Sequence, residues 1–187
     1  MRNAMRRGFR RALVIGLIIL AVLVGGLLWM GGDKVGVGLA QMYLPIRFRD
    51  VDHISPAEAW ELYQQGQENP TDSGPLFVDV RTVEEWEVSH IPGAVHFPNP
   101  EATPPESVRQ AMEEKKTVII YCAAGYRSAE ACRLWQAGSG GAGAGSGRMV
   151  NLNGAIFAWA NAGYPITGNK VHPFTNSARW MVRKELR

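Results

Sequence analysis

The pattern of apolar and polar positions divides the chain into three parts. An unbroken apolar stretch runs from Ala12 to Met30, and over residues 31–49 glycines are mixed with scattered apolar residues. From about residue 50 onward, short apolar runs alternate with segments that begin with helix-capping residues. Strands that alternate with helices in this way predict an α/β domain with a central, mostly parallel sheet flanked by helices.

Three apolar runs in this third part predict buried strands. They cover Leu76–Val80, Thr117–Tyr121 and Met149–Leu152, and each is short and mostly apolar. Ala94–Phe97 is a briefer extended piece that lies between the first two runs.

Capping signals place helices between these strands. The sequence SPAE at 55–58 combines a capping serine, a proline suited to the first helical turn and a glutamate that completes a capping box. Thr82 and Glu85 repeat this box for a short helix that ends near Val88. Further helices are expected over 106–114, from about 127 to 137, and over 155–162. The glycine-rich stretch 138–147 has no side chain able to pack and is expected to be a mobile connector.

The N-terminal end has the pattern of a membrane anchor. Residues 1–11 hold five arginines and no acid, and the apolar stretch 12–30 follows at once. At about 1.5 Å per residue this stretch spans roughly 28 Å, close to the ~30 Å core of a bilayer. We therefore expect a single-pass membrane protein with a cytoplasmic N-terminus, a transmembrane helix over 12–30 and a juxtamembrane linker over 31–49. The rest would be extracytoplasmic, on the periplasmic side if the protein is bacterial.

Two alternatives use the same residues. One is a cleaved secretory signal, with Gly38-Leu39-Ala40 as a poor cleavage site, and the other is a twin-arginine export signal at Arg6-Arg7-Gly8-Phe9. The uncleaved anchor is favoured because the apolar run is longer than the ~7–15 residues of a signal's apolar region.

The charge and the cysteines exclude several classes of protein. Five of the 20 basic residues lie in the N-terminal segment, which leaves 15 against 17 acidic residues and a net charge near −2 for the rest. No basic stripe with interleaved aromatic residues indicates nucleic-acid binding. Two cysteines, Cys122 and Cys132, are too few for a disulfide scaffold or a zinc site, and the four histidines are scattered. We expect neither a metal nor another cofactor.

The sequence YCAAGYRS at 121–128 carries the chemistry. A strand, a tight loop and a helix place Cys122 at the carboxyl edge of a parallel sheet, in front of a helix N-terminus. Unpaired amides and the helix dipole would stabilise its thiolate there. The small residues that follow let the backbone curl around one centre, and Arg127 either binds an anionic substrate or pairs with a surface acid. Cys132 falls within the helix after the loop and is expected to pack in the core.

Three stretches together match the pattern of a known family: FVDVRTVEEWEVSHIPGAVHFP at 77–98, VIIYCAAGYRSA at 118–129 and LNGAIFAWANAGYPI at 152–166. With them the chain resembles a single-domain rhodanese, a sulfurtransferase, over roughly residues 50–167. The resemblance implies that Cys122 accepts a sulfane sulfur from a donor such as thiosulfate and carries it as a persulfide. A thiophilic acceptor such as cyanide or a thiol would then receive it. The rhodanese-like domain would cover 50–168.

The resemblance also implies roles for the residues around Cys122. The substrate-binding loop would consist of Ala123, Ala124, Gly125, Tyr126, Arg127 and Ser128, in which Arg127 orients the donor anion. For Asp79 and Arg81, a structural role that holds the loop together through hydrogen bonds and an ion pair is favoured over contact with the substrate, and for His90 a role as a turn residue is favoured over that of a general base.

The loop length separates this pattern from the cysteine-dependent phosphatases. Those enzymes place an arginine six positions after the nucleophile, and Ser128 occupies that position here. Arg127 comes five positions after Cys122, and the smaller loop suits a sulfur atom better than a phosphate.

Several questions stay open at this point. The basic amphipathic tail 169–187 would either pack on the domain or lie against anionic lipid. Ser89 stands where the family usually has glycine, and Asn153-Gly154-Ala155 stands where two glycines are common. The alternative to an enzyme is a rhodanese-fold binding or scaffold module with an unused cysteine, or a thiol redox sensor. An activated Cys122 that alkylates much faster than Cys132 would favour the enzyme.

Overall fold

The computed structural model describes residues 15–19, 22, 25–26, 31–68, 74–138 and 147–187. Its centre is a five-stranded sheet in the order β1-β5-β4-β2-β3, and every pair of neighbouring strands is parallel. The strands are β1 His53–Ile54, β2 Leu76–Asp79, β3 Val95–His96, β4 Thr117–Tyr121 and β5 Arg148–Leu152. The predicted α/β class with a mostly parallel sheet is confirmed.

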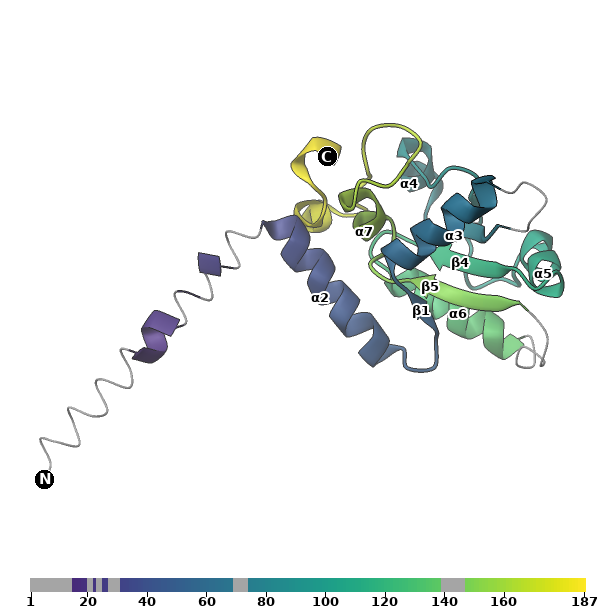
Figure 1. Ribbon diagram of the computed structural model, residues 1–187, viewed down its shortest axis with the longest axis horizontal. Coiled ribbons are helices and arrows are strands. Elements are labelled where there is room, and N and C mark those ends of the chain that lie inside the picture. The colour runs from purple at the N-terminus through teal and green to yellow at the C-terminus, as the bar shows by residue number, and fades with distance from the viewer. Residues whose placement is uncertain (1–14, 20–21, 23–24, 27–30, 69–73, 139–146) are drawn as a thin grey trace, which may run out of the picture.

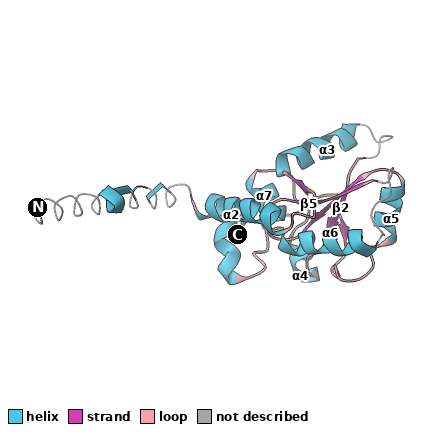
Figure 2. Ribbon diagram, turned by 90° about the horizontal axis from the view of Figure 1, so that it is seen from below, coloured by secondary structure: helices cyan, strands magenta, loops and turns pink. Residues whose placement is uncertain are grey.

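Helices cover both faces of this sheet, and Figure 2 shows α3 and α6 on opposite sides of it. The described helices are α2 Gly32–Arg47, α3 Pro56–Glu68, α4 Val83–Val88, α5 Glu106–Glu113, α6 Tyr126–Gly138 and α7 Ala155–Asn161. Two 3₁₀ helices, η1 Asn176–Met181 and η2 Lys184–Leu186, end the chain.

The helix starts follow the capping boxes in the sequence. Ser55 and Glu58 exchange hydrogen bonds at the start of α3, and Thr82 and Glu85 do so at the start of α4. Each box satisfies amides that the first turn of a helix leaves unpaired. Of the connector expected over 138–147, residues 139–146 lie outside the described part of the chain.

The core is apolar on both sides of the central strand β4. Val118, Ile119 and Ile120 are fully buried there because helices cover both faces. On the α3 and α7 side, Trp159 is also fully buried, and its ring meets the ring of Phe77 edge to face at 5.5 Å between centroids. This packing fixes the sheet against which the cysteine loop is placed.

Most of the segment expected to be a linker over 31–49 is the helix α2. Glycines and Pro45 argue against a helix here by propensity. Tertiary packing outweighs that preference, because Gly36 allows the ring of Trp180 to lie directly on the helix: a Cβ at this position would be 2.6 Å from the ring. Figure 1 shows α2 beside the C-terminal segment and α7.

The prediction of a membrane anchor needs correction. Of the expected span 12–30, only residues 15–19, 22 and 25–26 are described, and the cytoplasmic segment 1–11 lies outside the described residues. No helix formed by the described residues is long and apolar enough to cross a membrane. The helix α2 has 16 residues, or about 24 Å, and carries Asp33, Lys34 and Arg47. This finding contradicts the predicted localisation as a single-pass membrane protein with an extracytoplasmic domain.

The tail over 169–187 packs on the domain. Ala178 and Val182 are buried, and the amide of Asn161 on α7 donates a 2.8 Å hydrogen bond to the carbonyl of Met181. The backbone of Val171 also bonds to that of Leu186, which folds the tail back on itself.

Candidate active site at the Cys122 loop

The loop from Cys122 to Gly125 joins the end of β4 to the start of α6. The amide of Gly125 lies 3.2 Å from the Cys122 Sγ, and the hydroxyl of Ser128 lies 3.5 Å from it, so both donate toward the sulfur. Gly125 has a φ of +108°, a conformation that side chains disfavour and that turns its amide inward. The geometry therefore directs two donors and a helix N-terminus at one sulfur atom.

Neighbouring elements hold the loop in this shape. The carbonyls of Cys122 and Ala123 accept hydrogen bonds from the first turn of α7, from the amides of Ile156 and Phe157. The side chain of Cys122 is 2% exposed, and Ala123 is equally buried. The thiol is thus enclosed, and Ala124, Tyr126 and Arg127 are the loop residues that reach toward solvent.

Arg127 forms a bidentate ion pair with Glu85 of α4. Its two terminal nitrogens lie 2.9 and 2.8 Å from the two carboxylate oxygens, and Glu85 is 3% exposed whereas Arg127 is 36% exposed. Burial alone lowers the pKa of Arg127, but the hydrogen bonds to Glu85 and the charges of Cys122 and Glu85 outweigh it and raise that pKa. Arg127 is therefore a permanent cation close to Cys122 whose charge is paired.

Glu85 is a site residue that the sequence pattern did not reveal. Its local role as a helix cap is visible in the spacing from Thr82, but its contact with Arg127 joins residues 42 positions apart. Burial raises the pKa of Glu85, but the hydrogen bonds and the charge of Arg127 lower it by more, so the net shift of this pKa is downward. Glu85 is therefore an anion on the wall of the site.

Asp79 and Arg81 lie together at the end of β2, beside the end of β4 that leads into the loop. Their side chains are fully buried and form an ion pair of 2.7 Å, and Asp79 stands beside Tyr121 in the register of the sheet. Arg81 also donates to the carbonyl of Ser89, which ties β2 to the turn after α4. Burial and the Asp79 carboxylate raise the pKa of Tyr121 well above its usual value, so this phenol stays neutral.

His90 belongs to the turn after α4. Its ring stacks on Trp86 at 3.5 Å between centroids, its Nδ1 lies 3.2 Å from the carbonyl of Trp86, and its amide donates to the hydroxyl of Thr167. These contacts describe a residue that fixes the turn.

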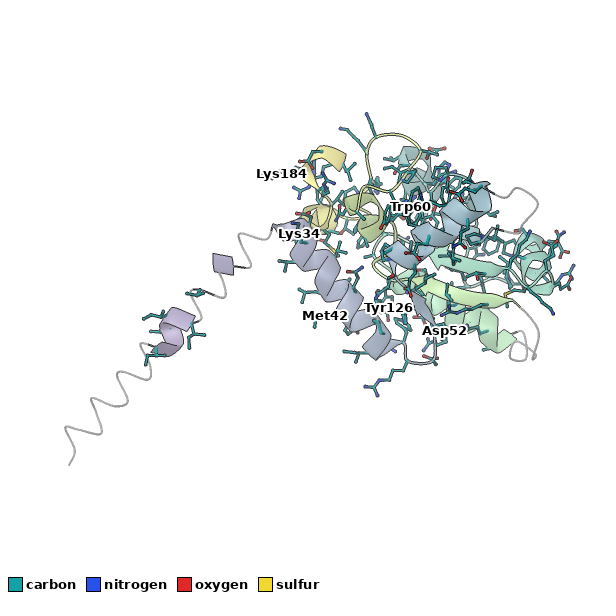
Figure 3. The ribbon with its side chains drawn as sticks, viewed as in Figure 1. Lys34, Met42, Asp52, Trp60, Tyr126 and Lys184 are labelled. Carbon is teal, nitrogen blue, oxygen red and sulfur yellow. The ribbon has the colours of Figure 1, made fainter. Side chains whose placement is uncertain are left out.

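Helix α2 and the tail form two further walls of the site. Leu44 of α2 lies against Gly125, where a Cβ would approach its Cδ1 to 2.5 Å, and Phe48 meets the ring of Tyr126 edge to face at 5.1 Å. Figure 3 shows Tyr126 near this end of α2. On the other side, the guanidinium of Arg127 lies 5.9 Å from the centre of the Phe174 ring.

Cys132 is not part of this site. It is a free thiol with no exposed surface in the middle of α6, and burial raises its pKa. No group of three or more potential metal ligands occurs within the residues that the structure describes.

A parallel α/β domain with a cysteine loop before a helix is the architecture of a protein with a loop-borne thiol at the edge of its sheet. Sequence comparison identifies the family. The profile of the rhodanese-like domain matches residues 55–162, and the chain therefore belongs to the rhodanese-like domain family. Helix α2 and the tail lie outside the matched residues.

Two relatives share part of the sequence. A sulfurtransferase of Allochromatium vinosum is 39% identical over 93 residues, which are 49% of this chain and 77% of that one. A probable adenylyltransferase/sulfurtransferase MoeZ of Mycobacterium tuberculosis is 34% identical over 88 residues, 47% of this chain but only 21% of that one. Among solved structures, a thiosulfate sulfurtransferase of Pseudomonas aeruginosa has 17% identity and a TM-score of 0.49, over 79% of this chain and 26% of that one.

Proposed function

We propose that the protein is a sulfurtransferase whose Cys122 accepts a sulfane sulfur, carries it as a persulfide and passes it to a thiophilic acceptor. The observation that carries this proposal is the pair of donors, the Gly125 amide and the Ser128 hydroxyl, that face the Cys122 Sγ at the N-terminus of α6. Membership of the rhodanese-like family and the relative called a sulfurtransferase support it.

The reaction has two steps. In the first, the Cys122 thiolate attacks the outer sulfur of a donor such as thiosulfate, the S–S bond of the donor breaks, and sulfite leaves with the bonding electron pair. The amide of Gly125 and the hydroxyl of Ser128 stabilise the anionic sulfur, since charge-assisted hydrogen bonds are the stronger kind. In the second step, cyanide or a thiolate attacks the outer persulfide sulfur and releases the Cys122 thiolate.

The surrounding residues act on this step in different ways. Arg127 would orient the donor's oxygens through the guanidinium N–H groups that Glu85 does not occupy, while the Asp79–Arg81 pair would fix the end of β2 beside the strand that leads into the loop. The small residues at 123–125 would limit the bulk that the added sulfur has to pass.

The test is the intact mass of the full chain after exposure to thiosulfate and removal of the excess. We expect a gain of one sulfur atom, lost again on addition of cyanide. The Cys122→Ser variant should gain nothing, whereas Cys132→Ser, the matched control, should load like the unaltered protein. Loading that survives in Cys122→Ser would refute the assignment of the nucleophile, and folded protein that accepts no sulfur would refute the proposed activity.

A further inference from the structure

The charged side chains around the Cys122 loop occur in pairs of opposite sign. Arg127 is paired with Glu85, and Arg81 with Asp79 at the end of β2. On the next turn of α6, Arg133 is paired with Glu130. Each pair has a net charge of zero.

One further cation among the described residues, Arg47, lies near the start of α6. Arg47 is exposed at the end of α2, and its guanidinium lies on the ring of Phe48, which separates it from Tyr126 at the start of α6. Water and salt screen an exposed charge at such a position. When Cys122 is a thiolate, the ionised side chains named here therefore carry a formal net charge of −1.

Arg127 keeps its hydrogen-bonding capacity although its charge is cancelled. A guanidinium has five N–H donors, and the contacts with Glu85 use one on each terminal nitrogen. One of the others interacts with Cys122, and the rest are available for the oxygens of a sulfonyl group. Such a site offers hydrogen bonds to these oxygens without the surplus positive charge that a dianion would need.

We propose that Glu85 is a positioning residue that sets the charge of the sulfur donor: by holding and neutralising Arg127, it disfavours dianionic thiosulfate relative to monoanionic sulfane donors such as alkyl thiosulfonates. This inference rests on the proposed sulfurtransferase activity and narrows its donor class. Both donors react in the same way. The Cys122 thiolate bonds to the outer sulfur, the donor S–S bond breaks, and the leaving group is sulfite from thiosulfate or an alkyl sulfinate from the thiosulfonate.

The test compares two donors that differ by one charge, thiosulfate and methanethiosulfonate. The rate constant for persulfide formation on Cys122 is measured by mass for the full chain and for Glu85→Gln at low ionic strength. Glutamine keeps an acceptor for Arg127 and for the cap at Thr82. The matched control is Glu87→Gln, which removes the same charge from an exposed position of the same helix.

The unaltered protein should react faster with methanethiosulfonate. In Glu85→Gln, the ratio of the thiosulfate rate to the methanethiosulfonate rate should rise about 3- to 30-fold. This is the effect on a rate of removing the repulsion between two unit charges about 8 Å apart, at effective dielectric constants of about 80 to 20. In Glu87→Gln the ratio should change less than about twofold, because an exposed charge is screened. A purely structural role of Glu85 would slow both donors equally and leave the ratio unchanged.

A second measurement needs no variant. If the site is net negative, the thiosulfate rate of the unaltered protein rises with ionic strength, and it rises more steeply than the methanethiosulfonate rate. A thiosulfate rate that is flat or falls with salt, or an unchanged donor ratio in folded Glu85→Gln, would overturn the inference while sulfur transfer itself stands. Failure of both donors to load Cys122 would refute the proposed function, and the inference with it.

Discussion

At the scale of single residues, the ion pair of Asp79 and Arg81 places two charges in the core, where each depends on the other. Both side chains are fully buried, and one nitrogen of Arg81 has no hydrogen-bond partner among the residues that the structure describes. Burial lowers the pKa of Arg81, but the hydrogen bonds and charge of Asp79 outweigh it and raise that pKa, so the arginine stays charged. Each charge is tolerated in the core only because the other is present.

Arg81→Met should therefore destabilise the protein strongly. It leaves the Asp79 carboxylate buried without its partner, which costs about 3–5 kcal/mol in comparable cases. The free energy of unfolding in urea measures this loss. Arg109→Met, which breaks an exposed ion pair with Glu106, is the control and should leave the urea midpoint almost unchanged. A small effect of Arg81→Met, or a double variant with Asp79→Asn that loses the full sum of the two single losses, would contradict this account.

Residue-level predictions from the sequence succeeded where the signal is local. Cys122 and Arg127 are placed by the order strand, loop and helix, and the capping role of Glu85 by its spacing from Thr82. The bond between Glu85 and Arg127 could not be predicted in this way, because it joins two helices distant in the chain. The sequence left Arg127 with either a substrate or a surface acid, and the structure pairs it with a buried one.

At the scale of elements, the turn between β4 and α6 depends on Gly125. Its φ of +108° and the closeness of Leu44 both exclude a side chain. Gly93 offers a matched comparison, because it also has a positive φ, +80°, but a Cβ there would meet nothing within 4 Å.

Gly125→Ala should destabilise the protein and slow persulfide formation. Backbone strain alone costs about 1–3 kcal/mol, and the overlap with Leu44 adds to it. The shift also moves the Gly125 amide away from the Cys122 Sγ. Gly93→Ala should lose stability through backbone strain but keep its sulfur loading. Adding Leu44→Ala to Gly125→Ala should recover part of the lost stability. Equal effects of the two glycine substitutions on loading by thiosulfate would show that the Gly125 amide has no special role.

Strands β2 to β5 and the helices from α3 to α7 were predictable because apolar runs and capping signals mark them in the sequence itself, whereas the two-residue strand β1 was not predicted. Helix α2 was not, since its glycines lower the helix propensity and the compensating contacts come from the far end of the chain. The membrane span was predicted from the length of one apolar run alone. In the structure, no helix formed by the described residues is long and apolar enough to cross a membrane.

At the scale of the whole molecule, helix α2 and the tail, which both lie outside the matched family residues, contact each other beside the site. Gly36 of α2 is buried against Trp180 and Met181, while Gly38 on the same helix has open space where a Cβ would be. Leu44, further along α2, covers Gly125 in the cysteine loop. The contact between α2 and the tail therefore supports the wall of the candidate site around Cys122 from a distance.

Gly36→Ala should separate these two ends, and Gly38→Ala is its control. A Cβ at position 36 would lie 2.6 Å from the Trp180 ring and 2.7 Å from the Met181 side chain, so α2 or the tail must move. We expect a lower urea midpoint, faster hydrogen exchange of the α2 amides and a changed rate of sulfur loading on Cys122. Gly38→Ala should instead raise stability by about 0.5–1 kcal/mol, since alanine favours the helix and nothing opposes it. If both substitutions stabilised the protein alike, the packing of α2 on the tail would not hold α2 in place beside Cys122. Opposite effects on stability, with altered sulfur loading only in Gly36→Ala, would show that the contact with the tail affects the reaction at Cys122.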